Sequence, residues 1–146
     1  MRNPVLLSGL AAAAIFAAAP ASADPASAND DAVTAARAVI ERQIDAFLDN
    51  DMAEAYSYTS AAIKAAFPQQ EQFADMIRRG YQPVYQPGNY AFGRGQELAG
   101  GTVIQELLIQ GLDGDDWTAL YLIERQDNGT MKISGVRIAP SALPQA

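Results

Sequence analysis

Two glutamates and a tyrosine in the second half of the chain have the chemistry for proton transfer. Glu106 stands between Ile104 and Leu108, and Glu124 follows an apolar run. A carboxyl group that loses water in an apolar pocket acquires a raised pKa and can act as a general acid or base. With Tyr121 as hydrogen-bond donor, either carboxylate would suit an isomerase-like or cyclase-like reaction. The alternative is a rim position or an ion pair with a neighbouring arginine.

Other kinds of catalytic and metal site are excluded or unsupported. The chain contains no histidine and no cysteine, which excludes Ser-His-Asp and Cys-His catalysis, disulfides and zinc-thiolate sites. Asp113, Asp115 and Asp116 surround Gly114 as in a calcium loop, but the full ligand spacing of such a loop is absent. This segment is instead typical of a solvated hairpin turn. We therefore expect no metal site and no cofactor.

Aromatic residues form a second group of candidates, which would line a ligand pocket. A buried tyrosine packs its ring and needs a partner for its hydroxyl, either in a core or around a ligand. Tyr81 and Tyr85 are the preferred candidates, because Pro83 and Pro87 are expected to hold the intervening loop extended and to present both rings. The complete set of pocket candidates is Tyr56, Arg79, Tyr81, Tyr85, Trp117 and Tyr121.

The first residues are typical of a secretory signal peptide. Arg2 gives a positive start, residues 5–19 are apolar, and the segment Ala21-Ser22-Ala23 has the small-residue spacing of a cleavage site. The apolar run is shorter than the roughly 20 residues that span a bilayer, which argues against a membrane anchor. We predict a signal peptide (1–23), a flexible leader (24–29), one domain (30–140) and a C-terminal tail (141–146). The mature protein would be periplasmic or secreted, with no membrane span.

The charge of the mature chain argues against nucleic acid as a partner. Cleavage after Ala23 removes one arginine and no acid, leaving 9 basic and 17 acidic residues, a net charge of −8 (9 − 17). The longest basic run is Arg78-Arg79. Binding to a phosphate backbone needs a basic patch, and neither this run nor the net charge supplies one.

The first half of the domain has the pattern of helices. Apolar spacing predicts one amphipathic helix over residues 30–48, with Asp51 and Ser60 capping two short helices after it. Gly80 would close a fourth helix in a left-handed conformation, and Arg78 and Arg79 fall in its last turn, where the helix dipole favours cations. The stripe predicted for the long helix comprises Val33, Arg37, Ile40, Ile44, Phe47 and Leu48.

The second half has the pattern of an antiparallel meander. Strand-like runs cover residues 90–98, 102–111, 116–126 and 131–140, and short glycine-containing turns separate them. Gly93 and Gly95 indicate a bulge that curls the sheet. Neither face of the central runs is cleanly polar, so both faces should be covered. Helices would cover one face, and a partner subunit would suit the other.

The order of these segments resembles the nuclear transport factor 2-like, or SnoaL-like, α+β cone. The resemblance rests on the long helix, the turn Phe-Leu-Asp-Asn-Asp-Met-Ala-Glu-Ala-Tyr (47–56), two further helices and the curled meander. The motifs Arg-Gly-Tyr (79–81), Pro-Val-Tyr (83–85), Trp-Thr-Ala-Leu-Tyr-Leu (117–122) and Ile-Ser-Gly-Val-Arg (133–137) resemble those of a family of small exported proteobacterial proteins. That family is classed as a domain of unknown function, DUF4864.

The resemblance implies a cystatin-like α+β fold in which a curled antiparallel sheet wraps the N-terminal helices around a mostly apolar pocket. Some members of the cone fold are isomerases or cyclases, whereas others bind molecules or dimerise, so the fold alone does not assign a function. We favour an exported, non-catalytic binding module for a small apolar or amphipathic molecule. The alternatives are an enzyme using Glu106, Glu124 and Tyr121, and an envelope protein that only forms a homodimer through the outer sheet face.

Overall fold

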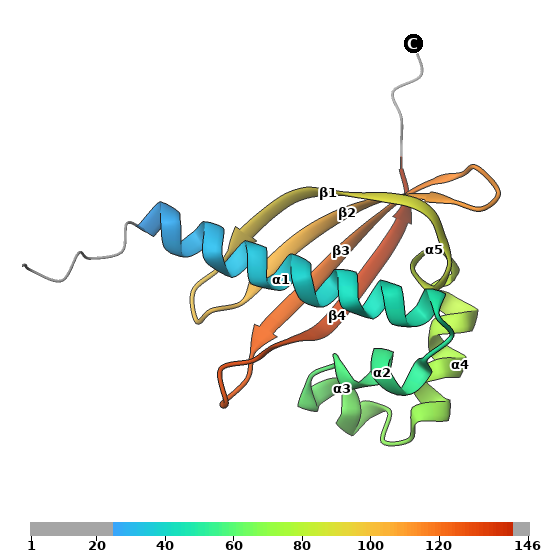
Figure 1. The fold of residues 1–146 in the computed structure, drawn as a ribbon, viewed down its shortest axis with the longest axis horizontal. Coiled ribbons are helices and arrows are strands. Elements are labelled where there is room, and N and C mark those ends of the chain that lie inside the picture. Colours follow the sequence, from blue (N-terminus) through green and yellow to red (C-terminus); the bar gives the residue numbers. More distant parts are fainter. Residues whose placement is uncertain (1–24, 142–146) are drawn as a thin grey trace, which may run out of the picture.

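The computed structural model describes residues 25–141, in which helices precede an antiparallel sheet (Figure 1). The strands are ordered β1-β2-β3-β4, which confirms the predicted meander and the α+β class. The predicted signal peptide lies outside the described residues, as does the predicted tail beyond residue 141. In chain order the elements are α1 (Pro25–Leu48), α2 (Met52–Ser57), α3 (Ala61–Ala66), α4 (Gln70–Gly80), α5 (Gln82–Tyr85), β1 (Pro87–Glu97), β2 (Val103–Gly111), β3 (Asp116–Arg125) and β4 (Met131–Pro140).

The long helix begins earlier than its apolar spacing predicts. α1 starts at Pro25 rather than Asp30, so residues 25–29 of the expected leader are helical. A tertiary contact accompanies this extension, because Asn29 Oδ1 accepts a hydrogen bond of 2.8 Å from the backbone N–H of Glu97 at the end of β1. Among residues 25–141, no helix has both the length and the apolar character to cross a bilayer.

Side-chain caps place the short helices where the sequence predicts them. Asp51 Oδ1 accepts a hydrogen bond of 3.0 Å from the backbone N–H of Glu54, and Ser60 caps α3. The backbone of Ser60 also donates to Ile133 O at 2.9 Å, and Ile133 N donates to Tyr58 O at 2.9 Å. These bonds attach the segment between α2 and α3 to the outer edge of β4.

The junction between the helices and the sheet corrects two expectations. Gly80 is the last residue of α4 and does not have a positive φ, because the backbone N–H of Tyr81 still donates to Ile77 O at 2.9 Å. The expected extended loop is wrong, since Pro83 lies in the first turn of the helical α5. Proline fits there because its fixed φ suits a helix and its missing N–H would have no partner. This turn buries Tyr85 instead of presenting it.

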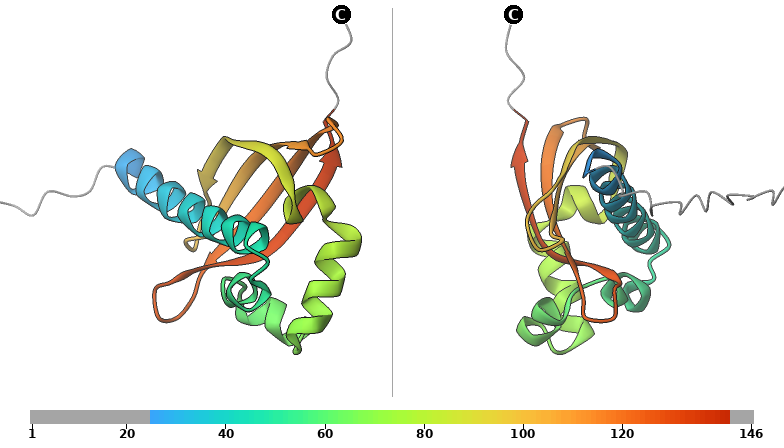
Figure 2. Two further views of the ribbon diagram at one scale, coloured as in Figure 1. Left: turned by 45° about the vertical axis from the view of Figure 1, so that its right-hand side comes forward. Right: turned by 90° about the vertical axis from the view of Figure 1, so that its left-hand side faces the viewer.

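The two faces of the sheet differ in what covers them. α1 crosses one face, which confirms that helices cover it, and the opposite face carries no described helix over its centre (Figure 2). Leu108 and Leu120 on that open face are therefore 45% and 42% exposed. A register shift between Phe92 and Gly95 bends β1, as the two glycines predicted. The covered face carries Val103, Gln105, Leu107, Ile109, Ala119, Tyr121 and Ile123.

Candidate ligand cavity

A cavity of about 230 Å³ lies between the helices and β4. Its wall takes residues from α1, α3, α4 and α5, from the chain around them, and from β4. Most of these side chains are apolar, and such a surface favours an apolar occupant over water. The lining residues are Gln43, Thr59, Ile63, Phe67, Phe73, Met76, Ile77, Tyr81, Val84, Ile133, Gly135 and Val136.

Aromatic packing holds the helical wall of the cavity in place. Phe73 and Ile77 lie one helical turn apart on α4 and are buried, so one face of this helix points inward. The ring of Phe73 stacks on Phe47 of α1 with centroids 6.3 Å apart, and it lies 5.3 Å from the ring of Tyr56. These contacts join α1, α2 and α4, so the wall is a packed part of the core.

Gln43 is the main polar group of the cavity wall. Its side chain is 3% exposed, and its Nε2 donates a hydrogen bond of 3.1 Å to Ala55 O. This bond fixes the amide orientation, because a carbonyl partner requires the NH₂ group. Gln43 Oε1 accepts no hydrogen bond from the residues that the structure describes, and is available to an N–H or O–H group in the cavity. Thr59 Oγ1 is already engaged, donating to Tyr56 O at 2.6 Å.

One of the six predicted pocket residues, Tyr81, lines this cavity. Tyr56 faces the core instead, and its hydroxyl donates to Phe67 O at 2.5 Å. Tyr85 packs edge-on against Phe47, with ring centroids 5.8 Å apart. The two tyrosines of the proline-rich segment therefore have different environments. Tyr81 lies in the cavity wall, and Tyr85 lies in the core.

The remaining candidates lie elsewhere. Arg79 is exposed in the last turn of α4, where the helix dipole favours its charge. Trp117 lines shallow hollows at the start of β3, away from the cavity. Tyr121 is fully buried on the covered face of the sheet and does not line the cavity.

The structure separates the proposed acid and tyrosine of the enzyme hypothesis. Strand alternation places Glu106 and Glu124 on the open face and Tyr121 on the covered face. Glu124 Oε2 accepts a hydrogen bond of 2.8 Å from Ser134 Oγ. Glu106 lies against Gly93 of β1. Neither carboxylate lines the cavity, so neither can act there together with the tyrosine hydroxyl.

The aspartates between β2 and β3 form a hairpin turn. Asp113 Oδ1 accepts a hydrogen bond of 3.0 Å from the backbone N–H of Asp115. Gly114 has a φ of +88°, a left-handed conformation that glycine adopts without strain. Across residues 25–141, no three acidic side chains gather as a metal-binding group.

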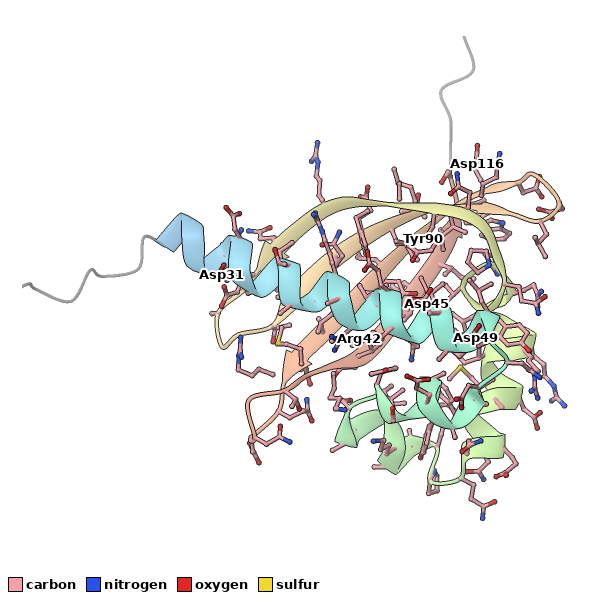
Figure 3. All side chains as sticks on the ribbon, viewed as in Figure 1. Asp31, Arg42, Asp45, Asp49, Tyr90 and Asp116 are labelled. Atoms are coloured by element: carbon pink, nitrogen blue, oxygen red, sulfur yellow. The ribbon has the colours of Figure 1, made fainter. Side chains whose placement is uncertain are left out.

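The hydroxyl group of Tyr121 is an unpaired polar group in the core. Its side chain is 0% exposed, and the hydroxyl forms no hydrogen bond with any residue that the structure describes. Burial raises the pKa of Tyr121, and the nearby Tyr90 adds to the shift. Tyr90 lies on the face that α1 crosses, near Asp45 of that helix (Figure 3). Burial, then Asp45 and Glu41, raises the pKa of Tyr90 as well.

Sequence reasoning missed Gln43, although a signal was present. The residue lies three positions after Ile40 and directly before Ile44, so it interrupts the apolar stripe of α1 with an amide. A polar residue inside a helical stripe must find a partner when the helix packs. The other missed lining residues, such as Met76 and Val136, are ordinary apolar side chains with no distinguishing spacing.

One of the comparisons with known proteins, with family models, covers almost all of the described chain. A family model with the description "Domain of unknown function (DUF4864)" matches residues 29–146. No curated protein and no solved structure matches the chain. The matched segment includes every residue that lines the cavity.

Proposed function

The chain belongs to the DUF4864 family of unknown function, and we propose from the geometry of its cavity that it binds a small, uncharged, mostly apolar molecule without chemical change. The observation that carries this proposal is an apolar wall containing one accessible amide oxygen, that of Gln43. This oxygen favours a ligand with an N–H or O–H group at one end. A charged ligand would lose its water without meeting an opposite charge on the lining residues.

The size of the cavity limits the ligand. Pockets for drug-sized molecules commonly have volumes of roughly 300–1,000 Å³, whereas this cavity measures about 230 Å³. A molecule of one or two small rings, or a short aliphatic chain, matches this volume. Tyr81 is the only ionisable residue in the lining, and the cavity wall contains no carboxylate that would act as a general base. Binding is therefore better supported than catalysis.

Filling the cavity is expected to abolish this binding. The probe is 1-naphthylamine, a two-ring aromatic amine that is uncharged at neutral pH, carries N–H groups and changes its fluorescence in apolar surroundings. We expect saturable binding of one probe to the wild-type chain. Met76→Trp places a larger apolar side chain into the cavity, and should weaken binding at least about tenfold, or about 1.4 kcal/mol.

The control adds the same side chain away from the cavity. Leu112→Trp, on a residue that is 72% exposed, should leave probe affinity unchanged. Ile63→Trp provides a second filling variant from another wall. Circular dichroism checks that each variant is folded. A wild-type chain without saturable binding, or filling variants that bind as tightly as Leu112→Trp, would contradict the proposal.

We also propose that the protein works after export, in the periplasm or outside the cell. The support is the signal-like segment, with its charged start at Arg2 and the small residues Ala21-Ser22-Ala23. Expression of the full chain in a bacterial host should yield an exported protein whose intact mass corresponds to residues 24–146. A protein of full-length mass in the cytoplasm would argue against export while leaving the binding proposal intact.

A further inference from the structure

The open face of the sheet exposes two large apolar side chains beside charged ones. It lies opposite α1, and in Figure 2 no described helix covers the middle strands on that side. Leu108 and Leu120 are 45% and 42% exposed there. A groove crosses this face from Gly80 and Tyr81, over β4, to Glu106 on β2. Exposed apolar side chains that gather on one face of a sheet are typical of docking surfaces.

The side chains of this face form three rows across the strands. In the two outer rows, a large apolar residue on β2 shares its row with a small residue on β4. In the central row, an acidic residue on β2 shares its row with a basic residue on β4. β3 contributes the middle residue of each row. The rows are Ile104–Leu122–Gly135, Glu106–Leu120–Arg137 and Leu108–Thr118–Ala139.

We propose that a second copy of this chain docks on the open face, with the twofold axis running along β3. Such an axis places β2 of one copy over β4 of its partner. Ile104 and Leu108 then meet Gly135 and Ala139, so large side chains fill the space beside small ones. Leu120 lies close to the axis and contacts its own equivalent. The interface is isologous, as in most homodimers.

The charges on the open face favour a twofold axis along β3 over one that runs across the strands. Glu106 and Arg137 flank Leu120 in one row, where Glu106 is half-buried and Arg137 is exposed. The axis along β3 brings Glu106 of each copy to Arg137 of the other. An axis across the strands would instead bring Glu106 to Glu106, and like charges oppose association. The net charge of −7 disfavours an anionic lipid surface as the occupant.

The proposed dimer also borders the ligand cavity. Tyr81 and Val136 line both the cavity and the groove on the open face. A partner copy seated in the groove would therefore cover this side of the cavity wall. The dimer nevertheless rests on the sheet surface alone, and it does not depend on the proposed ligand.

Charge reversal directly tests the proposed orientation of the two copies. The protein is produced from the full chain, and its mass is measured by sedimentation velocity over about 1–100 μM. We expect a wild-type dimer in this range. Glu106→Arg and Arg137→Glu should each raise the dimer dissociation constant at least about tenfold, because each places like charges together twice. The double variant E106R/R137E should restore association, because it exchanges the two charges.

Matched controls reverse charges outside the open face. Glu71→Arg, on an exposed position of α4, and Arg42→Glu, on an exposed position of α1 on the opposite side of the sheet, should leave the dimer intact. Leu120→Arg should give a folded monomer, because the residue is already 42% exposed within one chain. A wild-type monomer at 100 μM, a Leu120→Arg dimer, or a double variant no tighter than the single reversals would overturn the proposal.

Discussion

Replacing Gly95 with alanine is expected to lower the free energy of unfolding by about 3 kcal/mol. A Cβ atom at this position would collide with Gln105 Oε1 and would lie 2.6 Å from Val33 Cγ1. Val33 belongs to α1 and Gln105 to β2, so the new methyl group would force the helix away from the sheet. Both neighbours are buried, which leaves neither an easy way to move.

The surroundings of Gln105 explain why it cannot simply rotate. Arg37 Nε donates to Gln105 Oε1 at 3.1 Å, and Arg37 Nη2 donates to Gly93 O at 3.1 Å. Gln105 Nε2 donates to Glu106 O at 2.8 Å and to Gly93 O at 3.3 Å. The guanidinium of Arg37 also lies over the ring of Phe92, 5.4 Å from its centroid. These bonds tie α1 to the bulge in β1, and moving the amide would break them in a buried site.

Urea unfolding followed by circular dichroism measures this effect, and Gly80→Ala is the matched control. A Cβ at Gly80 would meet no atom within 4 Å, and this glycine has no positive φ. Alanine there should raise stability by about 0.5–1 kcal/mol, because it reduces the freedom of the unfolded chain. Similar free energies of unfolding for the two variants would show that Gly95 is not needed for close packing.

Tyr121→Phe is expected to raise the free energy of unfolding by about 1–3 kcal/mol. The side chain is fully buried, and its hydroxyl lost hydrogen bonds to water without gaining one from the residues described. Removing the oxygen removes this penalty and keeps the ring in the core. Tyr56→Phe is the matched control, and its expected effect on the free energy of unfolding has the opposite sign. It deletes a hydroxyl that donates to Phe67 O, and should lower stability by about 1 kcal/mol.

The pH dependence of unfolding gives a second test at Tyr121. Burial raises the pKa of this tyrosine in the folded state, whereas in the unfolded chain the pKa is about 10. Below that value both states keep the proton and the contribution to stability is constant. Above it, the unfolded state releases the proton first, so stability falls by about 1.4 kcal/mol per pH unit. Tyr121→Phe should reduce this fall in the free energy of unfolding at alkaline pH. If Tyr121→Phe lowered stability at neutral pH as much as Tyr56→Phe does, the hydroxyl of Tyr121 would not be an unpaired, destabilising group.

The fold was predictable wherever a local pattern has one structural solution. Residues of β2 and β3 alternate between two faces because a strand has a two-residue period, whatever covers those faces. Asp51 and Ser60 cap helices because a short oxygen-bearing side chain satisfies a free N–H at that position. The extended loop predicted at Pro83 was wrong because proline is compatible both with an extended loop and with the first turn of a helix. Only the burial of the surrounding turn distinguishes these alternatives.

The sequence by itself determined the family, the order of helices and strands, and which residues share a strand face, because these depend on spacing along the chain. The cavity depends on packing between segments that are distant in sequence. Gln43, Tyr81 and Val136 meet only when α1, the end of α4 and β4 pack together. Tyr81 and Tyr85 have similar local surroundings in the sequence, and no local rule assigns one to the cavity and the other to the core. The tertiary structure decided this, because the position of α5 against Phe47 sets which ring loses its contact with solvent.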